Sequence, residues 1–330
     1  MKVLVTGGLG YIGSHTVSEL LMREHEILIV DNLENSSVDV IDSLHELTGI
    51  RPGFEKIDIR DSAILDDSVA AFRPDAIIHF AAKKDPQESI DNPLAYYETN
   101  VTGSINVLKS ANRHSVRQFV FSSSAAVYGH AKQTPITEDH VIQPLSPYAS
   151  SKRMVEVVLQ DVFAGGKAGC AVTLRYFNPV GTHRSGALIP HHPKTSKNLF
   201  PAVVRAARPG TEILTVHGDD LPTFDGTGVR DYVHVQDLAA GHVAALERVE
   251  STPGAKILNI GTGRGYSVRQ VIGAFEEMLG LEVRHKYGPP RPGDPVVSFA
   301  DTSKATATLS WEPQFDLPEM VKDEWRAAVR

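Results

Sequence analysis

Residues 2–13 read KVLVTGGLGYIG, an apolar run rich in β-branched residues that ends in a glycine-rich turn. A helical pattern follows, with Leu20 and Leu21 on one side, and a second apolar run, residues 26–30, closes at Asp31. A G-x-G-x-x-G spacing between a strand and a helix is typical of a dinucleotide-binding βαβ unit. The stretch therefore predicts such a unit at the start of the chain.

The glycines and the acid have separate roles in that unit. Gly8, Gly10 and Gly13 let the backbone approach a pyrophosphate, whose negative charge is favoured by the helix N-terminus. Asp31 stands where an acid accepts a hydrogen bond from a ribose 2′-hydroxyl, and a 2′-phosphate would meet a like charge there. We therefore predict that the unit binds NAD rather than NADP. The alternative is a glycine-rich turn without a ligand.

Strand patterns continue to alternate with helical ones along the chain. The apolar runs are residues 53–59, 75–82, 117–121, 171–175 and 256–261. Strands that alternate with helices imply right-handed crossovers and a parallel sheet. We predict an α/β fold, with a Rossmann-type doubly wound parallel sheet and a smaller, loop-rich C-terminal lobe for the substrate.

Several polar or small residues follow these strands directly. The glycine turn, Asp31, Ala81, Ser124 and Asn178 all stand at strand ends. Parallel strands bring their carboxyl ends to one edge of the sheet, and ligands bind beyond that edge. This convergence is the main sequence argument for a functional site.

Two other features allow more than one interpretation. Asp58, near the end of a predicted strand, either faces an adenine edge or caps the helix that begins near Ser62. His191 and His192 are adjacent, but no third ligand stands at a suitable spacing. We therefore predict a solvated loop there and no metal site.

We divide the chain into two domains. Residues 1–178 form the predicted NAD-binding domain. Residues 179–330 form mainly a substrate-binding lobe, with some segments, about residues 225–245, returning to the first domain. The lobe begins where the sequence becomes rich in proline, glycine, histidine and charge. Within it, Arg230 and Arg291 are candidates to clamp a diphosphate.

Tyr148 and Lys152 form a candidate proton-transfer pair. Four residues apart on a helix, they share one face, and Ser146 and Pro147 suit the cap and the first turn. A phenol has a pKa near ~10, and a nearby ammonium group favours the phenolate. We predict that Lys152 lowers the pKa of Tyr148. The alternative is an ordinary surface pair, because a Tyr-x-x-x-Lys spacing is common.

Composition excludes several classes of partner. The formal net charge is −7, which implies no basic face, so we predict no nucleic-acid partner. Cys170 is the only cysteine, which excludes an intrachain disulfide and fits a reducing compartment. We see no secretory signal and no apolar stretch of membrane-spanning length. We therefore expect a cytoplasmic protein that binds no membrane.

Taken together, these motifs resemble the family of the UDP-glucose 4-epimerases (UDP-galactose 4-epimerases), within the extended short-chain dehydrogenase/reductases. The resemblance runs along essentially the whole chain. Its most specific motifs are RYFNPVG, residues 175–181, and DGTGVRDY, residues 225–232. The others lie at residues 6–15, 31–32, 58–61, 79–82, 122–129 and 148–152.

The resemblance implies a mechanism. Tyr148 is the general base, and Lys152 holds the nicotinamide ribose and lowers the tyrosine pKa together with the positive nicotinamide ring. Ser124 relays the proton of the sugar 4-hydroxyl to Tyr148. Hydride passes from sugar C4 to NAD, and the resulting 4-keto sugar turns and takes hydride back on its other face. The implied activity is NAD-dependent 4-epimerisation of UDP-galactose and UDP-glucose, with the UDP-N-acetylhexosamines as further candidates.

The resemblance also implies two sets of binding residues. The NAD set is Gly7, Gly10, Tyr11, Ile12, Gly13, Asp31, Asn32, Asp58, Ile59, Phe80, Ala81, Ala82, Lys84, Asn100, Ser122, Tyr148, Lys152 and Phe177. The UDP-sugar set is Lys84, Ser124, Tyr148, Asn178, Asn198, Leu199, His217, Arg230, Arg291, Asp294 and Ser298.

The chain departs from the family pattern at three places. Residues 85–87, Asp-Pro-Gln, replace a run of small residues and add a charge and a rigid proline beside the substrate entrance. His217 stands where an aromatic side chain often lies near uracil, and a histidine can still stack there. Ser298 stands where some members carry a tyrosine that narrows the sugar pocket.

Three rival functions remain to be weighed. Nucleotide-sugar dehydratases follow their serine or threonine with an Asp-Glu pair, whereas Ala125 and Ala126 follow Ser124 here. A UDP-uronic acid 4-epimerase is harder to separate by sequence. A non-catalytic NAD-binding regulator would not need Tyr148, Lys152 and Ser124, and all three are present.

We also expect a homodimer. The segment 92–114 and the helix after Tyr148 both carry apolar faces, more than one sheet needs. In the family, paired helices of this kind form a four-helix interface between two copies. The alternative is burial of these faces within the chain's own lobe.

Overall fold

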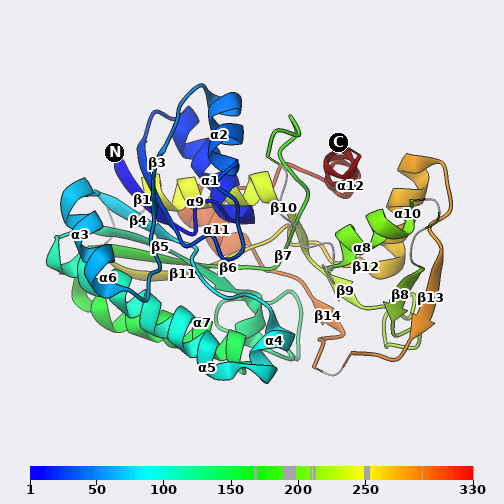
Figure 1. Cartoon of the computed structure of the whole chain (residues 1–330). Coiled ribbons are helices and arrows are strands. Elements are labelled where there is room, and N and C mark those ends of the chain that lie inside the picture. The colour runs from blue at the N-terminus through cyan, green and yellow to red at the C-terminus, as the bar shows by residue number, and fades with distance from the viewer. Residues whose placement is uncertain are drawn as a thin grey trace.

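The computed structural model describes residues 1–166, 169–188, 198–208, 210, 213–248, 253–291 and 293–329. Its centre is a seven-stranded sheet of order β11-β6-β5-β4-β1-β2-β3, in which every pairing is parallel. Helices cover both faces of this sheet, and a second lobe adjoins it (Figure 1). The predicted α/β fold with a doubly wound parallel sheet is confirmed.

The strands of the sheet carry continuous apolar runs because both of their faces are buried. In β1, Val3 and Val5 pack toward one face and Leu4 toward the other. The strands are β1 (Lys2–Thr6), β2 (Glu26–Asp31), β3 (Gly53–Lys56), β4 (Ala76–His79), β5 (Gln118–Ser124), β6 (Cys170–Tyr176) and β11 (Gly254–Ile260). The strand predicted over 53–59 is thus shorter than expected and ends at Lys56.

Two groups of helices form the outer layers. One face of the sheet is covered by α1 (Tyr11–Met22), α2 (Val40–Thr48), α9 (Val235–Arg248) and α11 (Ser303–Leu309). The other face is covered by α3 (Ser62–Phe72), α6 (Gly103–Arg113) and α7 (Pro147–Val162). Helix α9 packs on α1, and β11 lies next to β6 at one end of the sheet. Segments after residue 178 therefore belong to the sheet domain. The domain boundaries themselves stay a prediction.

Side-chain caps fix where two of these helices begin. The Ser146 hydroxyl accepts a hydrogen bond from the Ala149 amide at 3.2 Å, and Pro147 is the first residue of α7, both as predicted. In α3 the cap is Asp61, which accepts from the Ile64 amide at 3.3 Å. The alternative in which Asp58 caps this helix is therefore wrong.

The segment predicted as one helix over 92–114 contains a change of helical type. It is made of α5 (Pro93–Tyr96), a π-helical turn (Tyr97–Thr102) and α6, without a break between them. A π-turn inserts an extra residue per turn and is frequent at functional sites. Here it carries Asn100, which lies only 2% exposed beneath the sheet's carboxyl edge.

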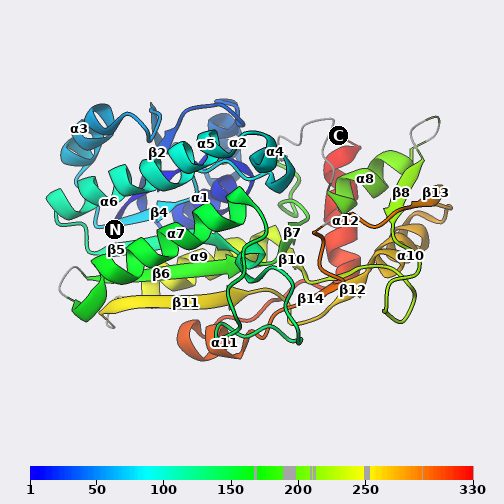
Figure 2. The same ribbon diagram turned by 90° about the horizontal axis from the view of Figure 1, so that it is seen from below.

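The second lobe has its own apolar core, and its helices lie beside the sheet domain (Figure 2). Its helices are α8 (Leu199–Ala206), α10 (Val268–Leu279) and α12 (Leu317–Ala328), and its strands β8 (Leu214–His217) and β13 (His285–Gly288) pair in parallel. Short pairings connect it to the sheet domain through β7 (Asn178–Val180), β9 (Val229–Arg230), β10 (Tyr232–His234), β12 (Tyr266–Ser267) and β14 (Val297–Ser298). Among the residues that the structure describes, none of the helices has the length and apolarity needed to cross a membrane.

Candidate active site

The strand order reverses between β1 and β4. From β1 the chain proceeds to β2 and β3 on one side, and from β4 to β5, β6 and β11 on the other. A crevice outside the carboxyl ends of the strands forms at such a reversal and is where ligands bind in open α/β sheets. The loops that follow β1 and β4 flank this crevice, and six residues of the predicted NAD set lie in them: Gly7, Gly10, Phe80, Ala81, Ala82 and Lys84.

The loop after β1 is built so that only glycine fits at two positions. Gly7 has φ of 69°, and a Cβ on it would lie 2.6 Å from the backbone nitrogen of Ala81 in the loop after β4. A Cβ on Gly13 would lie 2.3 Å from the carbonyl oxygen of Gly7. The loop therefore packs tightly under the N-terminus of α1, which begins at Tyr11. This backbone cradle fits the pyrophosphate of a dinucleotide.

Asp31 is the last residue of β2 and is 7% exposed. Its carboxylate accepts hydrogen bonds from the Leu9 amide at 3.2 Å, the Leu33 amide at 2.9 Å and the Ser36 hydroxyl at 2.9 Å. These bonds fix the acid between the glycine loop and the loop after β2. The position fits an acid that receives a ribose hydroxyl, as the sequence predicts.

Asn32 and Asp58 link the next two loops. The Asn32 amide donates to Asp58 Oδ2 at 2.9 Å, and the Arg60 guanidinium donates to both oxygens of the same carboxylate. The hydrogen bonds from Arg60 hold the pKa of Asp58 well below its usual range. Asp58 therefore stays ionised beside Ile59, which is buried at the same strand end.

Tyr148, Ser124 and Lys152 come together at the end of β5 and the start of α7. Ser124, the last residue of β5, lies beside Tyr148, close enough for its hydroxyl to affect the pKa of the phenol. Lys152 is 4% exposed, and its ammonium donates to the carbonyl of Ser122 at 2.7 Å. The three predicted catalytic residues thus occupy one site, with Lys152 one helical turn behind Tyr148.

The pKa shifts in this site differ from the sequence expectation. Burial raises the pKa of Tyr148, and the neighbouring Ser124 hydroxyl opposes the rise. The predicted lowering of this pKa by Lys152 is not present in the cofactor-free protein, where the net shift is upward and Lys152 is not one of its causes. Burial also lowers the pKa of Lys152 to about 7, opposed by the Glu156 carboxylate. Any net lowering of the tyrosine pKa must then come from charge that a bound ligand contributes.

A buried ion pair that the sequence analysis missed supports the catalytic helix. Glu156, one turn after Lys152, and Arg175 in β6 are 0% and 1% exposed. The guanidinium donates two hydrogen bonds to the carboxylate, at 2.8 and 2.7 Å, and the Ser123 hydroxyl donates a third at 2.6 Å. Ser123 directly precedes Ser124, so the pair joins α7 to both strands under the site. The sequence signal for this pair was the position of Glu156, four residues after Lys152, which puts both side chains on one face of the helix.

Asn100 connects the loop after β4 to the catalytic helix. Its carbonyl accepts from the Lys83 amide at 2.8 Å, and its amide donates to the Lys83 carbonyl at 3.0 Å and to the Ser151 hydroxyl at 2.9 Å. Ser151 in turn donates to the carbonyl of Tyr148 at 2.7 Å. Asn100 therefore fixes the relative positions of the two segments.

The remaining residues of the predicted NAD set lie at the same edge. Phe80, Ala81 and Ala82 form the half-buried loop directly after β4. Ser122 and Phe177 are each 6% exposed at the ends of β5 and β6. The remaining members are Tyr11 and Ile12, in the first turn of α1, and Lys84, which is exposed in the loop that leads to α4 (Pro86–Asp91).

Three members of the predicted UDP-sugar set, Lys84, Ser124 and Tyr148, lie in the sheet domain, and the others are distributed over the second lobe and its connections to the sheet. Arg230 and Ser298 are register partners in β9 and β14, and the Arg230 guanidinium lies 3.9 Å from the Asp294 carboxylate. Arg291, three residues before Asp294 in the sequence, is exposed. His217 ends β8, with its ring Nδ1 3.0 Å from the carbonyl of Pro289. Three further members are Asn178, which begins β7, Asn198, which precedes α8, and Leu199, which begins it.

The departure at residues 85–87 has a local structural role. The Asp85 carboxylate accepts hydrogen bonds from the amides of Gln87 at 2.8 Å and Glu88 at 3.1 Å. Pro86 is the first residue of α4, where proline is well tolerated. The added charge and proline thus build the start of a short helix.

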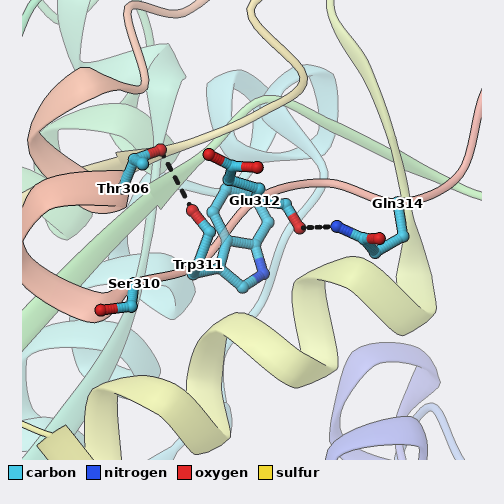
Figure 3. Close-up of a pocket in the computed structure, with 5 residues that line it drawn as sticks. All are labelled: Thr306, Ser310, Trp311, Glu312 and Gln314. Carbon is cyan, nitrogen blue, oxygen red and sulfur yellow. Dashed lines mark hydrogen bonds between the residues drawn. The ribbon is translucent and has the colours of Figure 1, made fainter.

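Figure 3 shows a surface hollow lined by Thr306, Ser310, Trp311, Glu312 and Gln314. The Thr306 hydroxyl donates to the Trp311 carbonyl, and the Gln314 amide donates to the Glu312 carbonyl, both at 3.1 Å. These bonds stabilise the turn after α11, and no predicted site residue lines the hollow. We therefore assign it no part in the chemistry.

The predicted loop at His191 and His192 lies outside the described residues. Within the part of the chain that is described, no three histidine, cysteine or acidic side chains are grouped so as to hold a metal ion.

The chain is similar to known proteins along its whole length. Residues 3–261 match the model of the NAD dependent epimerase/dehydratase family. A UDP-glucose 4-epimerase of Bacillus subtilis (strain 168) is 44% identical over 326 residues, which cover 99% of this chain and 96% of that protein.

Solved structures agree with this similarity. A UDP-glucose-4-epimerase from Stenotrophomonas maltophila, with bound NAD and formylated UDP-arabinopyranose, has a TM-score of 0.97 at 43% identity, covering 99% of this chain and 97% of that one. A UDP-glucose 4-epimerase from Bifidobacterium longum, in complex with NAD+ and UDP, has a TM-score of 0.92 at 39% identity, covering 100% of this chain and 98% of that one.

Proposed function

Because the chain belongs to the NAD dependent epimerase/dehydratase family, we propose that it interconverts UDP-galactose and UDP-glucose by inverting the configuration at sugar C4. The observation that carries this proposal is the convergence of Tyr148, Ser124 and Lys152 beside a glycine cradle that fits NAD. The reaction passes through a transient 4-keto sugar. When bound, NAD supplies an acceptor that takes the hydrogen of C4 and returns it to the opposite face.

The chain's own residues move and hold the proton. Tyr148 takes the proton of the sugar 4-hydroxyl and later gives it back, with the Ser124 hydroxyl beside it. Burial raises the pKa of Tyr148, so the phenolate needs a positive charge close to it while the site is loaded. Lys152 holds the nicotinamide ribose from one helical turn away, fixed by the Ser122 carbonyl.

The binding residues follow from the same geometry. The backbone around Gly7 and Gly13 holds the pyrophosphate, and Asp31 holds the adenosine ribose. Arg230 and Arg291 hold the diphosphate of the UDP-sugar, as guanidinium groups commonly do. The remaining members of the two predicted sets line the space between these anchors.

Ser298 extends the proposal to a second class of substrate. Its small side chain lies beside Arg230 in the β9–β14 pairing. A 2-acetamido group enlarges the sugar, and a bulky side chain here would clash with it. We therefore include the UDP-N-acetylhexosamines among the substrates.

The proposal includes a homodimer. Helices α5 and α7 pack against each other and lie on one side of the molecule (Figure 2). Leu94 in α5 is 78% exposed, and Met154, Val157 and Val162 in α7 are 46%, 40% and 39% exposed. A second copy of this face would cover these side chains. The single cysteine, Cys170, is buried and free, which supports a cytoplasmic location.

One incubation tests the activity. The purified protein is mixed with UDP-galactose without added NAD, and UDP-glucose is measured by chromatography. We expect formation of UDP-glucose, because NAD is regenerated in each turnover and copurifies with the protein. Conversion of UDP-galacturonic acid without conversion of UDP-galactose would contradict the proposal in favour of a uronate epimerase.

A further inference from the structure

Two charged side chains join the loops that follow β2 and β4. Lys83, in the loop after β4, donates from its ammonium to a carboxylate oxygen of Glu34, in the loop after β2. The Lys83 side chain is only 16% exposed, and that of Glu34 is 42% exposed. The hydrogen bond from Lys83 is the largest cause that lowers the pKa of Glu34, so the carboxylate is ionised at neutral pH. Neither residue belongs to the predicted binding sets.

The order of the strands in the sheet shows which loop this contact spans. β2 and β4 are the two neighbours of β1, so a contact between their loops spans the glycine loop that follows β1. Glu34 stands three residues after Asp31, which is placed to hold the adenosine ribose. The ion pair therefore spans the adenosine half of the crevice.

Both ends of the contact are held by other bonds. The backbone of Lys83 is fixed on both sides by buried Asn100, at 2.8 and 3.0 Å. The amide nitrogen of Glu34 donates to the Asn32 side chain at 3.0 Å, and Asn32 donates to Asp58 at 2.9 Å. A continuous series of polar contacts thus runs from the loop after β4 to the loops after β2 and β3. These bonds fix the backbone at both ends of the contact, which lowers the entropy that closing the contact costs.

We propose that Lys83 and Glu34 form a clasp that retains NAD by closing over its adenosine end. The inference rests on the proposed function, in which the cofactor must stay bound because the hydrogen taken from C4 has to be returned. A dinucleotide can leave only when the contact between the two loops opens. The pair acts on cofactor release rather than on the reacting atoms, so both are positioning residues.

The test measures release of NAD rather than turnover. Protein loaded with radiolabelled NAD is freed of excess label by gel filtration and diluted into unlabelled NAD, and the remaining bound label is counted over time. Lys83→Met and Glu34→Gln each release NAD about three- to tenfold faster than wild type, because one charge-assisted bond is lost. The exchanged double variant, Lys83→Glu with Glu34→Lys, restores release to within about twofold of wild type.

Two controls separate the clasp from a general stabilising contact. Arg51→Gln breaks an exposed ion pair of 2.7 Å between the segment before β3 and Asp42 in α2, and leaves NAD release unchanged. The thermal midpoint of each variant without cofactor stays at the wild-type value. Release rates in both single variants within twofold of wild type would overturn the proposal, as would an exchanged variant that releases NAD as fast as the single variants. A wild type that retains no label would instead refute the proposed cofactor function.

Discussion

The buried ion pair between Glu156 and Arg175 leads to a prediction about the free energy of unfolding, and the burial of both side chains sets its magnitude. Glu156→Gln keeps the shape of the side chain and removes its charge, which leaves the Arg175 guanidinium buried without an anion. Removing one partner of a buried pair typically costs about 3–5 kcal/mol, because the remaining charge stays desolvated. The side chains of Glu156 and Arg175 are 0% and 2% exposed, so we expect the full effect.

A neighbouring contact supplies the matched control. Arg153 also lies near Glu156, at 3.2 Å, but its side chain is 31% exposed. Water screens such a contact, so Arg153→Gln should cost less than about 1 kcal/mol. The double variant Glu156→Leu with Arg175→Met removes both charges and should be less destabilised than Glu156→Gln.

The assay is unfolding in guanidinium chloride, followed by circular dichroism on the cofactor-free protein. Because α7 also carries Tyr148 and Lys152, kcat should fall in Glu156→Gln in parallel with stability. If Glu156→Gln and Arg153→Gln lost equal free energy of unfolding, the argument from burial would be refuted.

Four further outcomes are expected. Tyr148→Phe should lower turnover by about 10²–10⁴-fold while the amount of bound NAD stays unchanged; a rate above half of wild type would show that another group is the base. Ser298→Tyr should abolish epimerisation of UDP-N-acetylgalactosamine and preserve that of UDP-galactose, and equal activity of both proteins on the acetamido sugar would show that this position is no gate. Leu94→Arg should give the mass of a single chain in light scattering. The control variant Ile64→Arg, at an exposed position on α3, should still give the mass of a dimer. If the wild type already had the mass of a single chain, the proposed dimer would be contradicted. Burial lowers the pKa of Lys152 to about 7, below its unfolded value near ~10.4, so the unfolded chain binds more protons between these values. Stability of the cofactor-free protein should therefore rise with pH from about 7 to ~10, and Lys152→Met should remove that rise.

Local chemistry made much of the fold predictable from sequence. The strands β1 and β2 are continuous apolar runs because both faces of the sheet are buried, and the glycines between them are required by backbone contacts. Ser146 and Pro147 signal the start of α7 through the same hydrogen bonding that the structure contains.

Contacts between distant residues were harder to foresee. The π-turn at Tyr97–Thr102 has no compositional signal, so the direction of Asn100 could not be read from a regular helical period. Asp58 and Asp61 are both suitable caps for α3 by type, and only the backbone conformation decides between them. The raised pKa of Tyr148 depends on how much protein surrounds the phenol, which sequence spacing alone does not reveal.

The position of β11 at the edge of the sheet has a consequence for synthesis of the chain. Ribosomes deliver β6 first, and its partner, residues 254–260, follows only after α8, β8 and α9 have been made. Until then the nascent chain exposes the unpaired backbone of an apolar strand, Cys170–Tyr176, to other chains. A product that terminates before residue 254 keeps that edge open permanently, so the C-terminal third of the sequence also protects the N-terminal sheet from aggregation.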